Sequence, residues 1–70
     1  MPYQSIQDLP PTLQRSLPVH GQEIFRAAFN SAWQQYGGDE AMAHRVAWAA
    51  VKRTYRKWGG VWVLKPRGGD

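Results

Sequence analysis

The basic side chains of the C-terminal third are the residues whose type and spacing point most directly to chemistry. Residues 45–70 contain seven Lys and Arg against one Asp, a net charge of +6, whereas residues 1–44 contain two Arg against four acidic residues, a net charge of −2. Arg45, Lys52 and Arg56 recur at helical spacing and would share one face, with Arg53 at its edge. Such a face can follow the phosphates of a polyanion. The candidate polyanion-binding residues are Arg45, Lys52, Arg53, Arg56, Lys65 and Arg67.

A simpler interpretation of these basic residues stays open. Charged side chains on a small domain normally form a solvated face. Positive charge near the end of a helix is also favoured by the helix dipole. The sequence therefore indicates a cationic surface without deciding whether an anionic partner binds it.

Other reactive side chains offer little for catalysis or metal binding. The chain has no Cys, and its two histidines, His20 and His44, are far apart and make a poor zinc site. His44 is more typical of a packed histidine. Ser31 lies beside Asn30 in the middle of an expected helix, and no base or oxyanion site accompanies it. We expect both residues to bond the third helix or the N-terminal segment, and we predict a protein that is not an enzyme and needs no cofactor or metal.

Four tryptophans accompany the basic residues, and aromatic rings among cations can stack on the bases of single-stranded nucleic acid. Most of them should instead fill the core of so short a chain. Trp62 is the exception if Val61 and Val63 turn inward, because neighbouring residues of a strand face opposite sides. It would then lie exposed beside Lys65 and Arg67.

Three helices must position these groups. A short helix over about 11–17 begins at a pair of prolines, the second of them in its first turn, and ends before another proline. A second, amphipathic helix runs from residue 19 or 20 to residue 36, where two glycines stop it. Asp39 caps a third, Ala-rich helix over about 40–57, and the alanines predict close approach by another helix. The residues on one side of this third helix are Ala43, Val46, Ala47, Ala50, Val51, Thr54 and Trp58.

The segment Val61–Leu64 is a short run of strand-forming residues, and a lone strand leaves backbone groups unpaired. The extended segment at residues 2–6 is the other candidate strand, so we expect the two to pair. The expected fold is mainly α: a compact three-helix domain with a small two-stranded sheet joining the N- and C-terminal segments. One domain would span residues 1–65, followed by a short tail at 66–70.

Length and composition limit the class of protein. Seventy residues make one domain, and four Trp, three Tyr and two Phe supply a dense core. No apolar stretch approaches the ~20 residues of a membrane span, and the N-terminus lacks the pattern of a signal peptide. The absence of Cys is compatible with a reducing compartment. We therefore expect a soluble, cytoplasmic protein.

Three segments of the chain together resemble the ChaB family. They are Leu9-Pro10 followed by Leu17–His20, the central Ala28–Trp33, and His44–Lys52, in the family's order and approximate spacing. The resemblance covers about residues 1–64. The residues of these motifs and of the core that goes with them are Leu9, Pro10, Leu17, Pro18, His20, Phe29, Asn30, Trp33, His44, Val46, Ala47, Trp48, Ala50 and Val51.

The resemblance implies a compact fold of three helices with a small sheet. It also implies a regulator of a cation/proton antiporter, with a membrane cation transporter as partner at its cytoplasmic face. The same domain occurs in viral proteins and beside nucleic-acid-associated domains, which implies DNA binding as an alternative. Some members carry a long acidic loop between the second and third helices, whereas Gly37–Glu40 here falls short of the roughly six to eight oxygen ligands that calcium prefers.

Two functions therefore stay open. One is a binding protein that regulates a cation transporter, which rests on the resemblance. The other is a nucleic-acid-binding module that uses the basic face of the third helix, which rests on the charge pattern.

Overall fold

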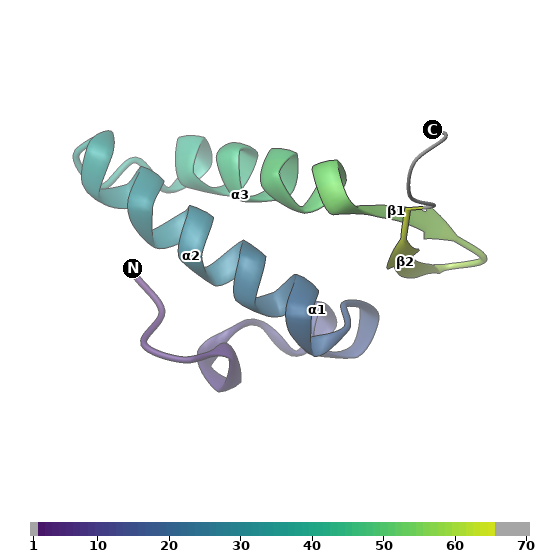
Figure 1. Cartoon of the computed structure of the whole chain (residues 1–70). Helices are drawn as coiled ribbons and strands as arrows, with labels where there is room; N and C mark the ends of the chain where they lie inside the picture. The colour runs from purple at the N-terminus through teal and green to yellow at the C-terminus, as the bar shows by residue number, and fades with distance from the viewer. Residues whose placement is uncertain (1, 66–70) are drawn as a thin grey trace.

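Three helices and a C-terminal β-hairpin organise residues 2–65, the part of the chain that this computed structural model describes (Figure 1). The elements in chain order are the 3₁₀ helix η1 (Ile6–Asp8), α1 (Pro11–Ser16), α2 (Val19–Gln35), α3 (Glu40–Thr54), β1 (Tyr55–Trp58) and β2 (Val61–Leu64). The fold is mainly helical, as predicted, and α1 and α2 end within one residue of their predicted bounds. The predicted tail at 66–70, with Arg67, lies outside the described residues.

Helices α2 and α3 lie side by side and enclose most of the core (Figure 1). Phe25 and Phe29 of α2 are fully buried, and their rings stack with 6.1 Å between centroids. Against them α3 presents Ala43, Ala47 and Val51, which are also fully buried. The small alanine side chains let the two helices approach closely, as their abundance predicts.

The N-terminal segment and α1 close the core on the other side of α2 (Figure 1). Leu9, Leu13 and Leu17 are buried there. In α2, the Nε2 of Gln22 donates to the carbonyls of Leu17 at 2.8 Å and Gln14 at 3.2 Å. The Nε2 of Gln14 in turn donates to the Leu9 carbonyl at 2.7 Å. Because Gln22 is buried, these bonds give partners to polar groups that are shielded from water.

The predicted pairing of the N-terminal segment with the C-terminal strand is wrong. The N-terminal segment runs beside α2 instead, where Asn30 takes the place of a neighbouring strand. Its Oδ1 accepts from the Tyr3 N–H at 2.8 Å, and its Nδ2 donates to the Tyr3 carbonyl at 2.7 Å. The Tyr3 ring packs on Phe29 with 4.9 Å between centroids. Of the two contacts expected for Asn30, the structure contains the one to the N-terminal segment, and a single amide side chain satisfies the backbone of Tyr3.

The sheet is a hairpin that includes the end of the predicted third helix. Helix α3 ends at Thr54 rather than at residue 57, and β1 pairs antiparallel with β2, from Tyr55 opposite Leu64 to Trp58 opposite Val61. The turn is Gly59-Gly60, with φ of 58° and 87°. These left-handed values are typical of a two-residue hairpin turn. The backbone hydrogen-bonding groups of β2 thus find their partners in β1, the strand that precedes it in the chain.

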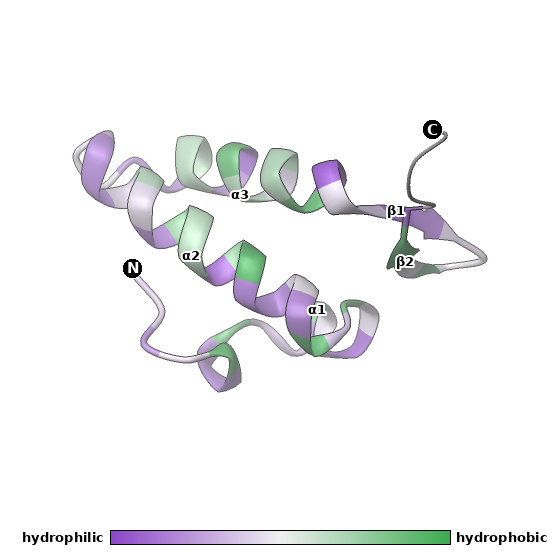
Figure 2. Ribbon diagram, in the orientation of Figure 1, coloured by the Kyte–Doolittle hydropathy of each residue, from purple (hydrophilic) through white to green (hydrophobic). Residues whose placement is uncertain are grey.

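Burial of the Tyr55 side chain favours the end of α3 at Thr54. The Tyr55 side chain is 2% exposed and lies against Gly21 of α2, where an added Cβ would come within 3.3 Å of the Tyr55 ring. Extending the chain at Tyr55 buries this large ring beside α2. The hairpin then projects from the end of α3 (Figure 1), with the hydrophilic β1 next to the hydrophobic β2 (Figure 2).

Candidate partner-binding surface

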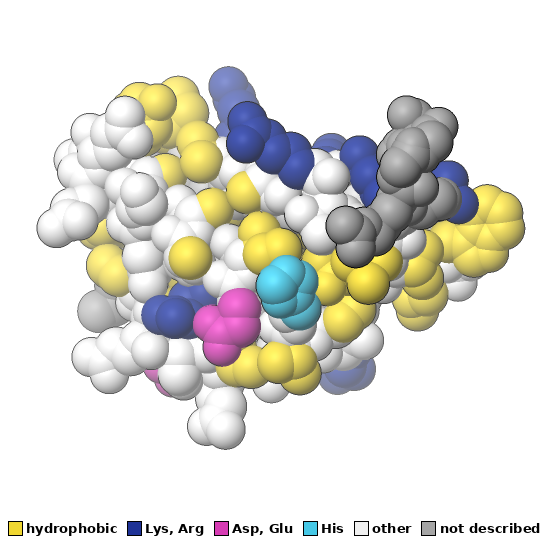
Figure 3. All heavy atoms as spheres, viewed as in Figure 1, with side chains coloured by type: hydrophobic (Ala, Val, Ile, Leu, Met, Phe, Trp, Pro, Cys, Tyr) yellow, Lys and Arg dark blue, Asp and Glu magenta, His cyan; other side chains and the backbone are white. Residues whose placement is uncertain are grey.

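Exposed basic side chains lie on α3 and continue onto the hairpin (Figure 3). Arg56 belongs to β1, because α3 ends before it. The prediction that all four basic residues lie on the third helix is therefore wrong for Arg56. Lys57 and Lys65, also on or next to the hairpin, add positive charge there, with Lys57 on the opposite face of the hairpin from Arg56. We call this surface the basic edge, and it consists of Arg45, Lys52, Arg53, Arg56, Lys57 and Lys65.

The basic edge has no acidic partner within residues 2–65. The ion pair found in this part of the chain joins Arg26 to Glu23, both on α2, at 3.3 Å. From residue 41 to residue 65 the sequence contains no Asp or Glu. Charges of one sign gathered along neighbouring elements of a small molecule attract anions through their summed field. The edge is therefore a surface on which an anionic partner would concentrate.

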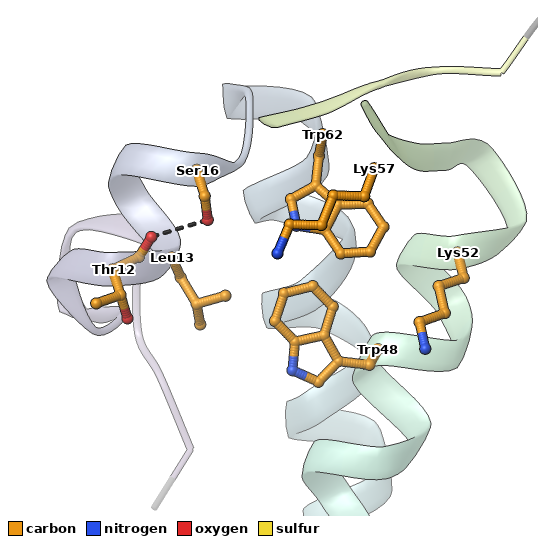
Figure 4. A pocket seen from close by; sticks show the side chains of 7 residues that line it. All are labelled: Thr12, Leu13, Ser16, Trp48, Lys52, Lys57 and Trp62. Carbon is orange, nitrogen blue, oxygen red and sulfur yellow. Dashed lines mark hydrogen bonds between the residues drawn. The ribbon is translucent and has the colours of Figure 1, made fainter. Parts of the chain in front are cut away.

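An open pocket of about 420 Å³ lies between α1, α3 and the hairpin (Figure 4). Trp48 of α3 and Trp62 of β2 stack in it, with 5.3 Å between centroids and 30° between planes. The Lys57 Nζ lies 5.9 Å from the Trp62 ring centroid, and Figure 4 shows both lysines beside the indole rings. The pocket is lined by Thr12, Leu13, Ser16, Trp48, Lys52, Lys57 and Trp62. It combines apolar aromatic walls with two positive charges, which suits an apolar group that carries an anion.

Trp58 is the most exposed aromatic residue in the described chain, at 66%. The Arg56 guanidinium lies over its ring, 5.4 Å from the centroid. The sequence pattern predicts Trp58 on the apolar face of the third helix, which is wrong because the chain has left the helix before this residue. The exposed position considered for Trp62 is also not found: its ring is half-buried against Trp48, and Val61 faces solvent.

The motif residues mostly build the core and its border rather than the surface. His44 is packed, as expected, with its ring edge-on to Phe25 at 5.7 Å and to Phe29 at 5.3 Å between centroids. Pro10 and Pro18 occupy the N-cap positions of α1 and α2, and His20 is exposed at the start of α2. The fully or partly buried motif residues are Leu9, Pro10, Leu17, Phe29, Asn30, Trp33, His44, Val46, Ala47, Trp48, Ala50 and Val51.

Residues 2–65 gather few groups that could ligate a metal or act on a substrate. No three of their His, Asp and Glu side chains come together, and Ser31 lies on the exposed face of α2. Burial raises the pKa of the Tyr3 phenol above its ordinary value of 10.0, and the Glu40 carboxylate adds to the shift. This phenol therefore stays neutral at physiological pH. The chemistry that the basic edge and the pocket offer is binding, by charge and by aromatic contact.

Comparison with known proteins connects this fold with one family. The family model described as ChaB matches residues 9–65. The chain belongs to the ChaB family. Two relatives, both named "Putative cation transport regulator ChaB", come from Escherichia coli strain K12 and Shigella flexneri. Each is 47% identical over 66 residues, covering 81% of this chain and 87% of the relative.

A solved ChaB structure has the same fold. The NMR solution structure of the putative cation transport regulator ChaB matches with a TM-score of 0.82 and 43% identity, covering 93% of this chain and 100% of that one. ChaB membership confirms the resemblance seen in the three sequence motifs. The relatives are named as regulators of transport and not as enzymes. Within residues 2–65, no helix combines the length and the hydropathy that crossing a bilayer requires.

The sequence pattern did not lead us to include Lys57 or Trp58 among the candidate binding residues. A signal was present, since two glycines between two short runs with aromatic residues are typical of a hairpin turn. Treated as a hairpin, the pattern places Arg56 and Trp58 on one face and Lys57 with Trp62 on the other. The structure has this alternation.

Proposed function

We propose that this ChaB-family protein regulates cation transport by binding a membrane cation transporter at its cytoplasmic face. The name of its relatives supports the biological role. The observation that carries the mode of binding is the open pocket in which Lys52 and Lys57 accompany the stacked Trp48 and Trp62. The protein acts by occupying a surface and carries out no reaction of its own.

The pocket suits an acidic side chain, or a terminal carboxylate, carried on an apolar segment of the partner. Two ammonium groups at one hollow can donate charge-assisted hydrogen bonds to the same carboxylate. The indole rings of Trp48 and Trp62 can cover the apolar part of the segment, and aromatic anchors of this kind contribute most of the affinity in many interfaces. The rest of the basic edge would then steer an acidic surface toward the pocket.

Site-specific photo-crosslinking in the native host tests this proposal. A photo-reactive residue in place of Lys57 should give a covalent product with a cation transporter, identified by mass spectrometry. The product should diminish when Lys52→Ala is added, because that variant removes the second charge of the pocket. Gln34 is exposed near the far end of α2 and is the matched control position, from which we expect no such product.

Two results would contradict the proposal. One is a transporter crosslinked equally well from Gln34 and from Lys57, since the pocket would then have no special role. The other is a set of Lys57 products that contains only proteins unrelated to ion transport.

Nucleic-acid binding is a second candidate, favoured by the exposed Trp58 with Arg56 over its ring. An exposed indole can stack on a base while neighbouring cations contact phosphates. Because Arg56 and Trp58 lie on the hairpin, this surface is a small platform rather than a helix that enters a groove. Single strands would fit it better than a duplex.

Titration of labelled single-stranded and duplex DNA over a range of salt concentrations tests this second candidate. Each neutralised phosphate adds roughly 0.9 to the slope of log affinity against log salt for a duplex, so Lys52→Ala combined with Arg56→Ala should lower the slope by about 2. The pair Arg15→Ala and Arg26→Ala removes two cations outside the basic edge and should leave the slope unchanged. No measurable affinity at ~50 mM salt would remove this candidate.

A further inference from the structure

The tip of the hairpin exposes a group of apolar side chains. Trp58 and Val61, the residues on either side of the turn, are 66% and 48% exposed, whereas the exposed Leu64 lies at the base of the hairpin, opposite Tyr55. Trp58 and Val61 are paired directly across the turn, so their side chains lie on the same face. The hairpin projects at one end of the molecule, where Figure 3 shows hydrophobic side chains at the surface. Single exposed apolar residues are ordinary, but a group of them at a projecting tip marks an interaction site.

Cations lie along the hairpin that carries this apolar tip. The Arg56 guanidinium lies 5.4 Å from the Trp58 ring centroid. Lys57 is the next residue of β1 and lies on the opposite face of the hairpin, with Trp62. Lys65 lies at the base of the hairpin, where its N–H donates to the Thr54 carbonyl at 2.9 Å, and both lysines are exposed. No acidic residue lies between residues 41 and 65 to offset their charge. The hairpin therefore combines an apolar tip, with Arg56 beside it, and further positive charge along its length.

We infer that the hairpin tip binds the surface of an anionic lipid bilayer. Trp58 and Val61 enter the headgroup region, where indole rings are favoured, and the neighbouring cations contact lipid phosphates. Each Lys or Arg close to an anionic bilayer strengthens binding by roughly fivefold, and an apolar element together with a basic patch gives the two signals that stable attachment needs. The aliphatic Val61 favours lipid over nucleic acid, since it gains from an apolar environment and recognises neither base edges nor phosphates.

Membrane attachment goes beyond the proposed function, because it concerns lipid and requires no transporter. It would bring the basic edge and the pocket to the bilayer in which a transporter lies. A surface potential of this kind acts only within about a Debye length, roughly 10 Å at 0.1 M salt, so the attraction should weaken as salt rises.

Co-sedimentation of the full chain with lipid vesicles tests the inference. We expect binding to vesicles of phosphatidylglycerol and phosphatidylcholine, and little binding to phosphatidylcholine alone. Trp58→Ala should lower the partition coefficient by on the order of tenfold, and Arg56→Ala, which removes the cation beside Trp58, by roughly fivefold. Tyr36→Ala and Val19→Ser remove apolar side chains that are 46% and 63% exposed on α2 or next to it, and these matched controls should bind as the unsubstituted protein does.

Three results would overturn the inference: no binding to vesicles rich in phosphatidylglycerol at ~0.1 M salt, an equal loss of binding in Tyr36→Ala, or tight binding to DNA by a protein that ignores the vesicles. Circular dichroism of each variant shows whether its helices are intact, and all four substituted side chains are exposed or half-exposed at the surface. The vesicles contain no protein partner, so a failure here is distinct from a failure of the crosslinking experiment at Lys57.

Discussion

Replacing Asn30 by Asp tests how the N-terminal segment is held to α2. The substitution keeps the acceptor that lies 2.8 Å from the Tyr3 N–H, but it replaces the donor that lies 2.7 Å from the Tyr3 carbonyl by a second carboxylate oxygen. A hydrogen bond of this kind contributes a net ~0.5–1.5 kcal/mol, and an unsatisfied buried partner costs ~1–3 kcal/mol. Because the contact is only partly buried, we expect urea unfolding at neutral pH to show a loss of about 2 kcal/mol in the free energy of unfolding.

The same substitution should make stability depend on pH in a characteristic way. When protonated, the new carboxyl group can donate to the Tyr3 carbonyl, so folding raises its pKa above the unfolded value of about 3.9. A group whose pKa is raised by folding contributes stability that is present below the unfolded pKa and is lost as the pH rises through the folded pKa. The deficit relative to the unsubstituted protein should therefore shrink below about pH 4.

The control is Asn30→Ala, which can neither accept from nor donate to Tyr3 at any pH. Its deficit should stay constant as the pH falls. Equal deficits for Asn30→Asp and Asn30→Ala across the acid range would refute the two-bond contact.

Other perturbations test the neighbouring layer and the ion response. Gln22→Leu leaves the Leu17 carbonyl without its donor at 2.8 Å, and urea unfolding should show a loss of ~1–3 kcal/mol. Gly21→Val places a Cβ at 3.2 Å from Leu17 and 3.3 Å from the Tyr55 ring, so stability should fall by ~1–3 kcal/mol and amide exchange in the hairpin should accelerate. The raised pKa of Tyr3 contributes stability below about pH 10 that is lost as the pH rises through the raised value; unfolding measured between about pH 8 and pH 11 should thus show a smaller decline for Tyr3→Phe. Millimolar calcium or magnesium should leave Tm unchanged, since residues 2–65 contain no cluster of ligands; a rise of several degrees would contradict this.

The helices could be predicted from the sequence because local signals and tertiary contacts agree there. Asp39 caps α3 by accepting from the Met42 N–H at 3.1 Å, as its place before an Ala-rich run predicts. Ala43 and Ala47 lie in the same buried core cluster as the phenylalanines of α2. The alanine pattern that predicted close helix packing therefore marks core residues. Proline before α1 and α2 marks both starts.

The hairpin could not be assigned with equal ease, because two periodic patterns compete between residues 54 and 58. Val51 and Tyr55 are four residues apart and are both buried, which a helix would also allow. Whether Tyr55 continues the helix or begins a strand depends on a contact distant in the sequence, since the Tyr55 ring fills the space beside Gly21. Asn30 is a similar case: its type indicates a polar contact, but only the path of the N-terminal segment selects Tyr3 as the partner.

Charge was the part of the candidate surface that the sequence revealed most clearly. The excess of Lys and Arg after residue 44 can be counted without a structure. The pocket could not be foreseen, because it needs α1, α3 and the hairpin at one place, and Lys57 approaches Trp62 only once β1 is a strand.

The central claim is that the pocket acts on a cation transporter, and cation/proton exchange in everted membrane vesicles from the native host tests it most directly. Purified protein is added outside the vesicles, and a pH-sensitive dye reports the exchange that follows addition of sodium, potassium or calcium. We predict that the unsubstituted protein changes the exchange rate for at least one cation, that Lys52→Ala with Lys57→Ala largely abolishes the effect, and that Arg15→Ala with Arg26→Ala preserves it. Exchange rates that are the same with and without the unsubstituted protein, for all three cations, would contradict the claim.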